Sequence, residues 1–379
     1  MRSPVSSVAY HLLTESEPFS EFHGGAISRW VGNVLRDAST SVVVCPSTDT
    51  TWKFSPETVS VLPMMAYYRP LRPYLLRLPW MLHRIVLRQL FRSVLKRVRP
   101  GDVVWIHNRP DFAIALTPHI HRAGGRVVLH LHNAHLTEWP YALMRRVRVD
   151  RLIFVSEFLL KQARRKFPLL GTSFVLYNGA DETIFYPPSD LQKESSIPIA
   201  LFAGRLVKDK GVHVLIDAMK LLLQQGVKLQ LRIVGSSNFG GSGETDYTNQ
   251  LKANAPKTVT FLPYRSGAAL GSLFREADIF CSPSIWDEPF GLVNVEAFAS
   301  GLPVVSTDGG GASEIFMNGG GILVERGSVE QLASALRQLA EDAKLRSILG
   351  KQGYAAFLER FTWSIVRTQV QEIHRSLSL

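Results

Sequence analysis

Cysteine is scarce in this 379-residue chain, where only Cys45 and Cys281 occur. Two cysteines in apolar surroundings form neither a dense disulfide framework nor a thiolate cluster for a metal, so we expect two buried, reduced thiols. No apolar run approaches the ~18 uncharged residues of a membrane-spanning helix, and the first residues lack the apolar core of a signal peptide. These absences predict a cytoplasmic protein, and its length and 46% hydrophobic content suit two domains.

Two short signatures are also missing. The G-x-G-x-x-G spacing of a dinucleotide site does not occur, which disfavours a Rossmann dehydrogenase. No Asp-x-Asp pair occurs either, although such pairs often hold a metal ion against a pyrophosphate. Any phosphate chemistry in this chain is therefore expected to rely on side-chain cations and backbone amides.

Acidic residues are absent from Thr58 to Gly101, in a chain whose net charge is +11. Four of the basic residues in this window are spaced four apart among apolar positions, a pattern typical of a basic amphipathic helix. Such a helix either binds an anionic membrane surface or packs its apolar side on a sheet and leaves its charges in water; we favour membrane contact. The nine basic residues are Arg69, Arg72, Arg77, Arg84, Arg88, Arg92, Lys96, Arg97 and Arg99.

Strand and helix patterns alternate along the whole chain, on both sides of a polar, proline-containing stretch at residues 186–198. This alternation predicts two doubly wound α/β domains, at residues 1–190 and 191–355, and a final amphipathic helix within 356–379. The predicted strands are Ser7 to Leu13, Ser41 to Cys45, Val103 to His107, Arg126 to His132, Arg151 to Val155, Ile199 to Ala203, Gln230 to Val234, Val259 to Leu262, Asp278 to Ser282 and Pro303 to Ser306.

The stretch from Glu288 to Glu296 places two carboxylates eight positions apart, across a loop and the start of a helix. Pro289 is typical of the first turn of a helix, so the backbone N–H groups of Phe290, Gly291 and Leu292 are expected at its positive end. A phosphate could bind there, and each carboxylate could hold hydroxyl groups beside it. The alternative is an ordinary helix with one carboxylate at its start and one on its surface.

A second cluster follows the predicted strand Ile199 to Ala203, in the loop Gly204-Arg205-Leu-Val-Lys-Asp-Lys210-Gly. Arg205 offers a planar fork of donors and Lys210 a mobile point charge, so the pair could neutralise a diphosphate leaving group. Loops with this composition also occur on surfaces that bind nothing. The neighbouring motif at Glu288 favours the functional interpretation.

The first half holds glycines and histidines in positions that suit ligand binding. Gly24 and Gly25 open the first helix, where backbone amides can approach a phosphate, although a tight turn explains them equally well. His107 and His132 end predicted strands, and ligands of open α/β sheets gather at such ends. A histidine bonded to neighbouring backbone is the ordinary alternative.

The segment E-P-F-G-L-V-N-V-E, the G-R-x-x-x-x-K-G loop and the glycine pair together resemble glycosyltransferase family 4. The resemblance covers nearly the whole chain and implies a GT-B fold, in which two Rossmann-like domains face a cleft and a C-terminal helix returns to the N-terminal domain. It also implies a retaining enzyme that uses a nucleotide-diphosphate sugar without a metal or a further cofactor.

The resemblance implies a role for each matching residue. Glu288 would contact the donor sugar, Glu296 the ribose hydroxyls, and His132 the active centre, while Arg205 and Lys210 would hold the diphosphate. UDP is favoured over GDP, and the expected acceptor is a cell-envelope or surface glycan, lipid-linked and reached from the cytoplasmic face of the membrane. A sugar-nucleotide epimerase of the same architecture remains an alternative; a nucleic-acid-binding protein would explain the charge but not the paired glutamates.

Overall fold

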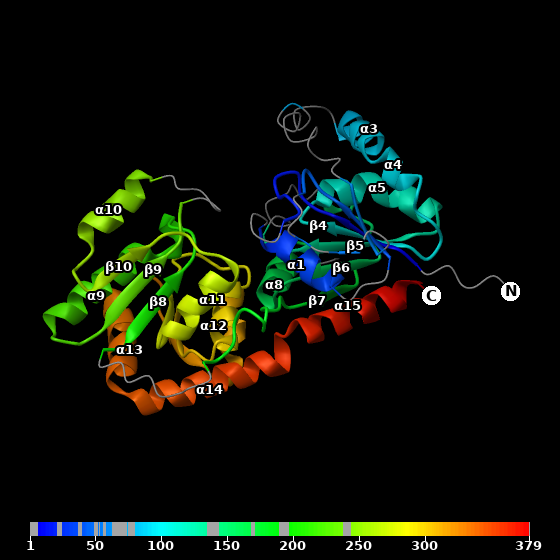
Figure 1. The fold of residues 1–379 in the computed structure, drawn as a ribbon. Coiled ribbons are helices and arrows are strands. Elements are labelled where there is room, and N and C mark those ends of the chain that lie inside the picture. The colour runs from blue at the N-terminus through cyan, green and yellow to red at the C-terminus, as the bar shows by residue number, and fades with distance from the viewer. Residues whose placement is uncertain are drawn as a thin grey trace. The chain divides into compact units, whose positions relative to one another are not determined.

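The computed structural model describes residues 7–20, 25–36, 40–48, 52, 54–55, 58–62, 74, 80–134, 144–167, 171–188, 197–237 and 244–378. The chain forms two compact units, and each has its own parallel sheet (Figure 1). The first unit comprises Met1–Tyr177 together with Val366–Leu379, and the second comprises Asn178–Ile365. The last helix therefore returns to the first unit, as predicted.

The first unit contains a seven-stranded sheet in the order β3-β2-β1-β4-β5-β6-β7. Its strands read as nearly continuous apolar runs, because helices cover them and water reaches few positions. The strands are β1 (Ala9–Leu12), β2 (Ser41–Val44), β3 (Val59–Leu62), β4 (Val103–His107), β5 (Arg126–Leu131), β6 (Arg151–Phe154) and β7 (Ser173–Val175). The helices are α1 (Ala26–Leu35), α3 (Trp80–Leu90), α4 (Arg92–Leu95), α5 (Pro110–Arg122), α8 (Glu157–Lys166) and most of α15 (Trp363–Ser378).

The second unit contains a six-stranded sheet in the order β10-β9-β8-β11-β12-β13. Its strands are β8 (Ile199–Ala203), β9 (Gln230–Val234), β10 (Val259–Leu262), β11 (Ile279–Ser282), β12 (Val304–Thr307) and β13 (Gly321–Val324). Its helical elements are η2 (Lys208–Lys210), α9 (Val212–Gln224), α10 (Asp246–Asn254), α11 (Gly267–Glu276), α12 (Leu292–Ala299), η3 (Gly310–Asn318), α13 (Val329–Glu341) and α14 (Ala343–Arg360).

Each sheet reverses its strand order beside its first strand, between β1 and β4 in one unit and between β8 and β11 in the other. In open α/β sheets, ligands bind outside the carboxyl ends of the strands at this switch point. The predicted architecture of two doubly wound units is confirmed, and the loops after β8 and β11 carry Arg205, Lys210 and Glu288.

The units divide at Tyr177 and Asn178, upstream of the expected position at residue 190. The segment after Asn178 packs on the second unit: the Phe185 and Phe274 ring centroids are 5.0 Å apart, and Arg275 donates a 2.9 Å hydrogen bond to the Ile184 carbonyl. The polar stretch that suggested a linker therefore follows the junction instead of forming it.

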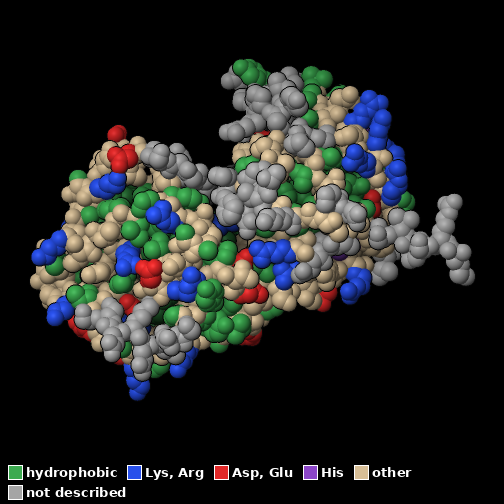
Figure 2. All heavy atoms as spheres, viewed as in Figure 1, with side chains coloured by type: hydrophobic (Ala, Val, Ile, Leu, Met, Phe, Trp, Pro, Cys, Tyr) green, Lys and Arg blue, Asp and Glu red, His purple; other side chains and the backbone are tan. Residues whose placement is uncertain are grey.

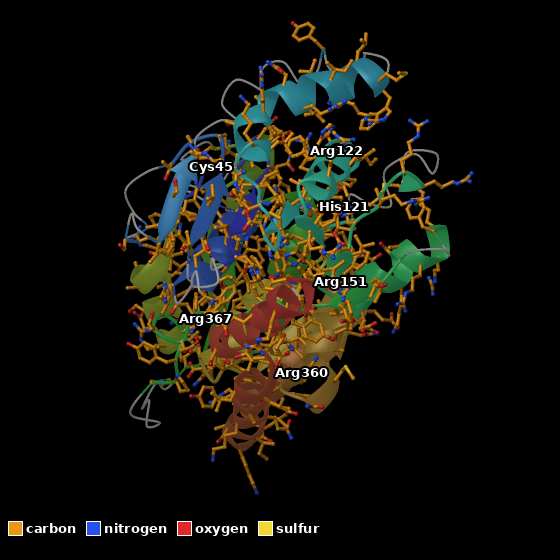
Figure 3. All side chains as sticks on the ribbon, turned by 90° about the vertical axis from the view of Figure 1, so that its right-hand side faces the viewer. Cys45, His121, Arg122, Arg151, Arg360 and Arg367 are labelled. Atoms are coloured by element: carbon orange, nitrogen blue, oxygen red, sulfur yellow. The ribbon has the colours of Figure 1, made fainter. Side chains whose placement is uncertain are left out.

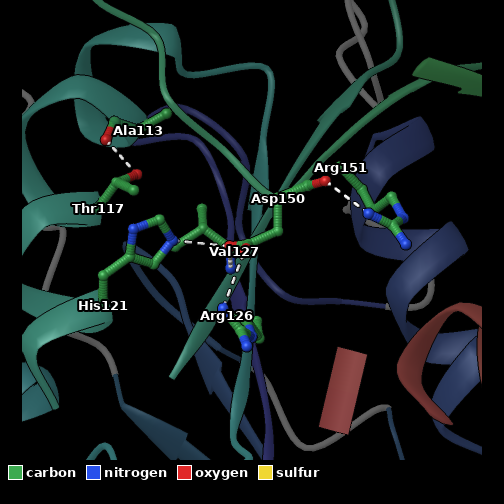
Figure 4. Close-up of polar contacts among 7 residues, drawn as sticks. All are labelled: Ala113, Thr117, His121, Arg126, Val127, Asp150 and Arg151. Carbon is green, nitrogen blue, oxygen red and sulfur yellow. Dashed lines mark hydrogen bonds and ion pairs between the residues drawn. The ribbon is translucent and has the colours of Figure 1, made fainter. Parts of the chain in front are cut away.

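Asp150 ties the strands of the first unit to the end of α5 (Figure 4). Its carboxylate accepts a 2.8 Å hydrogen bond from the Val127 amide and lies 2.7 Å from Nε2 of His121, and Arg126 approaches it at 3.4 Å. The groups that surround this carboxylate are all donors, so it joins the start of β5 to a helix that Pro110 opens at its first turn.

The part of α15 beyond Val366 packs on the sheet of the first unit. Arg367, labelled in Figure 3, donates a hydrogen bond to the Asn33 carbonyl at 3.3 Å, and Ser7 Oγ lies 2.8 Å from Nε2 of His374. Beside these contacts is a cavity of about 330 Å³. Residues from β1, β2, β4, α1 and α15 line it, among them His11, Trp105, Arg367 and His374.

Candidate functional site

The loop after β8 is held by glycines that no other residue could replace without strain. Gly211 has φ of +68°, and a Cβ atom there would lie 1.8 Å from the Pro283 carbonyl oxygen. A Cβ atom on Gly235 would lie 1.8 Å from the Gly204 carbonyl oxygen. The loops after β8, β9 and β11 therefore touch backbone to backbone, which fixes the position of the cations between them.

Lys210 and Glu288 form an ion pair at this switch point. Lys210 comes from η2 after β8 and Glu288 from the loop after β11, and their side chains are 21% and 10% exposed. Ser284 donates a 2.5 Å hydrogen bond to the same Glu288 oxygen, and Thr307 donates one of 2.6 Å to the Ser284 carbonyl. Two predicted site residues, 78 positions apart in the chain, are thus in direct contact.

The backbone of Glu288 rests on a glycine loop that opens η3. The Gly311 amide donates a 2.7 Å hydrogen bond to the Glu288 carbonyl, and a Cβ atom on Gly310 would lie 2.3 Å from the same oxygen. Gly310 also has φ of +66°, a conformation that favours glycine. The triple glycine at 309–311 therefore packs against the backbone of the residue that carries the carboxylate.

An aromatic ring and a second ion pair lie beside Lys210 and Glu288. The Trp286 ring, 37% exposed, lies with its centroid 5.5 Å from the Lys210 ammonium nitrogen, within the range of a cation–π contact. Asp287 pairs with Arg326, which also donates a hydrogen bond to the Asp308 carbonyl at 3.1 Å. Both carboxylates of the pair 287–288 therefore have a cationic partner.

The helix that carries the second glutamate begins later than expected. Its first residue is Leu292, and Gly291 caps it with φ of +91°, so Pro289 and Phe290 precede the helix. Phe290 is buried, with its ring centroid 6.0 Å from that of Phe361. The prediction that Pro289 opens the helix is therefore wrong, because the chain makes a left-handed turn at Gly291 first. Of the three predicted amides, that of Leu292 belongs to the first helical turn.

Glu296 lies within α12 and is 5% exposed, whereas Arg205 in the loop after β8 is exposed. Burial of a carboxylate disagrees with the alternative in which Glu296 is an ordinary solvated helix residue. The assignments of Glu296 to ribose and of Arg205 to the diphosphate stay predictions.

In the first unit, Gly25 stands before α1, while Gly24 lies outside the described residues. The Glu17 carboxylate occupies the start of this helix and accepts a 2.8 Å hydrogen bond from the Ser28 amide. A Cβ atom on Gly25 would lie 2.6 Å from the same carboxylate. Burial raises the pKa of Glu17. A phosphate at Gly25 would have to displace this internal carboxyl group.

His132 belongs to a chain of buried histidines. His11 Nδ1 lies 3.3 Å from His107 Nε2, and His107 Nδ1 lies 3.1 Å from His132 Nε2. The ring of His130 lies against that of His132, with centroids 4.0 Å apart and planes tilted by 42°, and Trp30 of α1 contacts both rings. Burial lowers the pKa of His11 and of His132 to about 3 and lowers those of His107 and His130 well below 6.5. All four imidazoles are neutral at pH 7.

Sequence reasoning missed several of these residues. Ser284 and Trp286 lie within the segment around Glu288, but no spacing rule marks a serine as a partner of Glu288 or a tryptophan as a partner of Lys210. His11 and His130 sit inside apolar strands, and the register of the parallel pair β4 and β5, in which His130 faces His107, could have placed it beside the predicted histidines.

In the described part of the basic window, from Trp80 onward, two helices occur, and the chain turns at Phe91 between α3 and α4. Leu87, Phe91 and Val94 point inward, while Met81 and Ile85 are 75% and 56% exposed. Figure 2 shows Lys and Arg side chains gathered over α3, α4 and α5, and a hollow there is lined by Arg88, Arg92, Lys96 and Arg122, among other residues. Arg69, Arg72 and Arg77 lie outside the described residues. Among the described residues, no helix is both long and apolar enough to cross a bilayer.

Cys45 and Cys281 are free and buried, as expected. Burial raises the pKa of the Cys45 thiol to about 12 and also raises that of Cys281. Neither thiol carries the charge at pH 7 that a nucleophile or a metal ligand would need.

Two family models match the chain, one over each half. The model described as Glycosyltransferase Family 4 matches residues 19–183, and the model described as Glycosyl transferases group 1 matches residues 188–356. A putative glycosyltransferase of Bacillus subtilis is 28% identical over 307 residues, which is 74% of each chain. A capsular polysaccharide biosynthesis glycosyltransferase of Staphylococcus aureus is 29% identical over 177 residues, 46% of this chain and 45% of that protein.

The fold is similar to that of HepE from Anabaena in its complex with UDP-glucose. That structure superimposes with a TM-score of 0.70 at 21% identity, over 98% of this chain and 100% of HepE. Two doubly wound units of this kind define the GT-B class of transferases. The chain belongs to the group 1, family 4 glycosyltransferases, a family of retaining hexosyltransferases that take their sugar from a nucleotide sugar.

Proposed function

We propose that this protein transfers a hexose from UDP-hexose to a hydroxyl group of a cell-envelope or surface-polysaccharide acceptor, with retention at the anomeric carbon. The observation that carries the proposal is the Lys210–Glu288 ion pair at the switch point of the second sheet. A cation and a hydroxyl-binding carboxylate in contact suit a ligand that has a diphosphate joined to a sugar. HepE, which has a similar fold, was solved with UDP-glucose.

The ion pair also suggests how the donor enters. Lys210 is neutralised by Glu288 before the donor binds, and a lysine ammonium has three donors, so one can stay on the carboxylate while others turn to phosphate oxygens. Glu288 keeps its second oxygen for a sugar hydroxyl, because the ion pair and Ser284 share Oε1. The diphosphate and the sugar would then be positioned by two residues that already hold each other.

Charge accumulates on the diphosphate as the anomeric bond breaks. Arg205 and Lys210 would stabilise that charge. The acceptor hydroxyl would attack the sugar on the face from which the phosphate leaves, and the leaving phosphate would take its proton. Because the two side chains supply the positive charge, the transfer step needs no metal ion. His132 would contact the donor sugar.

A thermal-shift series tests the donor assignment. The purified protein is incubated with UDP-, GDP- and ADP-sugars, and we expect UDP-sugars to raise the unfolding midpoint most, because binding stabilises the folded state by mass action. At a ligand concentration 100 times Kd the gain is about 2.7 kcal/mol. A larger shift with GDP-mannose would replace UDP by GDP, and no shift with any donor would remove the proposal.

Slow hydrolysis of the donor tests retention without knowledge of the acceptor. UDP-α-glucose is incubated with the enzyme, and the released glucose is read by proton NMR before it mutarotates. Retention predicts that α-glucose appears first. Initial release of β-glucose would show inversion and would contradict the same-face mechanism.

The acceptor is proposed to be lipid-linked and to be met at the cytoplasmic face of an anionic membrane. Exposed apolar residues at the start of α3, Met81 and Ile85, lie near basic residues that continue through α4, a combination that suits the headgroup region. Each basic residue near such a surface is worth about 1 kcal/mol. The relative in Staphylococcus aureus is named for capsular polysaccharide synthesis, which agrees with an envelope acceptor.

Sedimentation with anionic vesicles tests membrane binding. The test variant changes four basic residues of α3, α4 and the following turn to Gln, and we expect it to bind vesicles more weakly, to bind UDP normally and to use a lipid-linked acceptor poorly. The control variant removes four exposed charges of the second unit, so that loss of net charge is matched. The test set is Arg84, Arg88, Arg92 and Lys96; the control set is Lys228, Lys257, Lys344 and Lys351. Equal vesicle binding by both variants would point to a soluble acceptor.

A further inference from the structure

Three buried histidines in the first unit converge on one point. His107 ends β4, His130 is the fifth residue of β5, and His132 follows that strand, so the parallel pairing of β4 and β5 brings their rings together. One ring nitrogen from each lies within 4.8 Å of the other two. His107 and His130 are fully buried, and His132 is 9% exposed.

The hydrogen bonding of this cluster is incomplete. Neither ring nitrogen of His130, nor Nδ1 of His132, has a hydrogen-bond partner among the residues that the structure describes. A buried polar atom without a partner costs about 1–3 kcal/mol, so three such atoms in one place need an explanation. They belong to imidazoles that burial keeps neutral, so each ring has one nitrogen whose lone pair is free of a proton.

We infer that His107, His130 and His132 form a binding site for one divalent ion of the zinc class, with a water or an anion as the fourth ligand at the slightly exposed side of His132. Neutral imidazoles are ordinary ligands of Zn²⁺, and three of them with one open position make a recognised zinc set. This site goes beyond the proposed sugar transfer: it shares His132 with the proposed donor contact, but no step of the transfer is assigned to the ion.

The distances suit such an ion. Zinc–nitrogen bonds of 2.0–2.1 Å at tetrahedral angles place two ligand nitrogens roughly 3.3 Å apart. His107 Nδ1 and His132 Nε2 are already 3.1 Å apart. The nitrogen of His130 lies within 4.8 Å of both and would reach the ion by a rotation of its ring.

His11 supplies the outer support that histidine ligands normally have. Its Nδ1 lies 3.3 Å from Nε2 of His107. If Nε2 of His107 carries the proton and donates it to His11, then Nδ1 of His107 keeps its lone pair for the ion. The same outer contact orients the ring of His107 toward the cluster.

Cobalt absorption tests the inference on the full-length protein after treatment with a chelator. Co²⁺ bound by three imidazoles and one further ligand gives a visible spectrum much stronger than that of the hydrated ion. We expect one equivalent of Co²⁺ to produce this spectrum and one equivalent of Zn²⁺ to abolish it. The fluorescence of Trp30, whose ring centroid is 4.7 Å from that of His130, should fall as Co²⁺ binds.

Variants decide which residues hold the ion. His130→Gln and His132→Gln should each weaken Co²⁺ binding at least about 100-fold, more than the 10–100-fold loss that follows changes in an outer shell. The control is the double variant His119→Gln/His121→Gln, which removes two histidines of α5 outside the cluster, the second of them held by Asp150 (Figure 4). It should bind Co²⁺ as the parent protein does.

Folding and donor binding are followed in parallel by circular dichroism and by the UDP thermal shift. If His130→Gln does not fold, His132→Gln at the exposed side of the cluster decides the question. Absence of a saturable spectrum, its survival in both single variants, or its loss in the His119/His121 control would overturn the inference. None of these results bears on UDP binding, so failure of the metal site is separate from failure of the proposed function.

Discussion

The two units handle polar groups at their sheet ends in opposite ways. In the first unit four imidazoles are buried together, and burial holds them neutral. In the second unit the comparable position holds Lys210 and Glu288, which keep their charges by pairing with each other. Ten of the eleven histidines lie in residues of the first unit, and His213 is the exception.

This difference predicts how each unit should respond to acid and to the removal of a charged side chain. A neutral histidine cluster is stable only while protons are scarce, because the folded state cannot accept them without burying charge. An ion pair depends on both partners, because removal of one leaves the other charge unpaired. We therefore expect acid to destabilise the first unit, and removal of a charged side chain to impair the second.

The largest expected effect is acid destabilisation of the first unit. Unfolded histidines titrate near pH 6.5, whereas those of the cluster stay neutral in the folded state, so the unfolded chain binds more protons below pH 6.5. The free energy of unfolding therefore falls as pH drops from about 6.5 toward 3. From pH 7.5 to 5.5 each histidine should cost about 1.4 kcal/mol, or about 5.5 kcal/mol for the four.

Urea unfolding at the two pH values, followed by tryptophan fluorescence, measures this loss. His130→Leu provides the matched variant, because it removes one titrating group whose nitrogens have no partner among the described residues. Its loss of stability between the two pH values should be smaller by about 1.4 kcal/mol. Equal pH dependence in parent and variant would show that His130 is not held neutral by folding.

Removal of a cation from the second unit should have the next largest effect. Lys210→Ala and Arg205→Ala should each lower kcat by about 10²–10³-fold, equivalent to 2.7–4 kcal/mol, because each charge is needed most as the diphosphate leaves. Lys208→Ala is the matched control from the same turn of η2, where Lys208 is exposed. Activity in Lys210→Ala close to that of the control would remove Lys210 from the mechanism.

The two glutamates should separate binding from turnover. Calorimetry with UDP should show Glu296→Ala weakened by about 1.5–3 kcal/mol, the value of a hydrogen bond to a charged group. Glu288→Ala should bind UDP at least as well as the parent, because Lys210 loses its internal partner, and yet should turn over slowly. Equal UDP affinities in the two variants would contradict the assignment of ribose to Glu296.

The smallest effect is expected at the neighbouring ion pair of Asp287 and Arg326. Its side chains are 42% and 34% exposed, so water screens the pair and it should contribute at most about 1 kcal/mol. Arg326→Gln should lower the free energy of unfolding by no more than that and leave UDP affinity within about twofold of the parent. A clearly larger loss of stability or of UDP affinity in Arg326→Gln would mean that side-chain exposure does not predict how much this ion pair contributes.

The sequence predicted most of the fold, because buried parallel strands are marked by apolar runs of limited length. The missed strands, β3, β7 and β13, all lie at the edges of their sheets. An edge strand is covered less completely and needs fewer apolar residues: β7 has three residues and none is fully buried, and β13 begins at Gly321. Edge strands of this kind carry little periodic signal.

The candidate site was predicted in part. The spacing of Arg205, Lys210 and Glu288 suffices to bring them to one end of the sheet, because parallel strands align their carboxyl ends. The start of α12 was misplaced, since Pro289 is a common first residue of helices and nothing local reveals the left-handed turn at Gly291. The position of the Glu17 carboxylate at the start of α1 depends on tertiary folding, which no local motif predicts.

The return of α15 has a consequence for how the protein is made. The second unit is one continuous stretch, and its residues are complete once Ile365 has been added. The first unit also needs Val366 onward, where Arg367 reaches the Asn33 carbonyl and His374 reaches Ser7. At 5–20 residues per second, translation takes about 10 to 40 s to pass from Tyr177 to Val366. The unit synthesised first is therefore the one finished last, and until then the cavity beside β1 and α1 lacks the residues of α15 that line it.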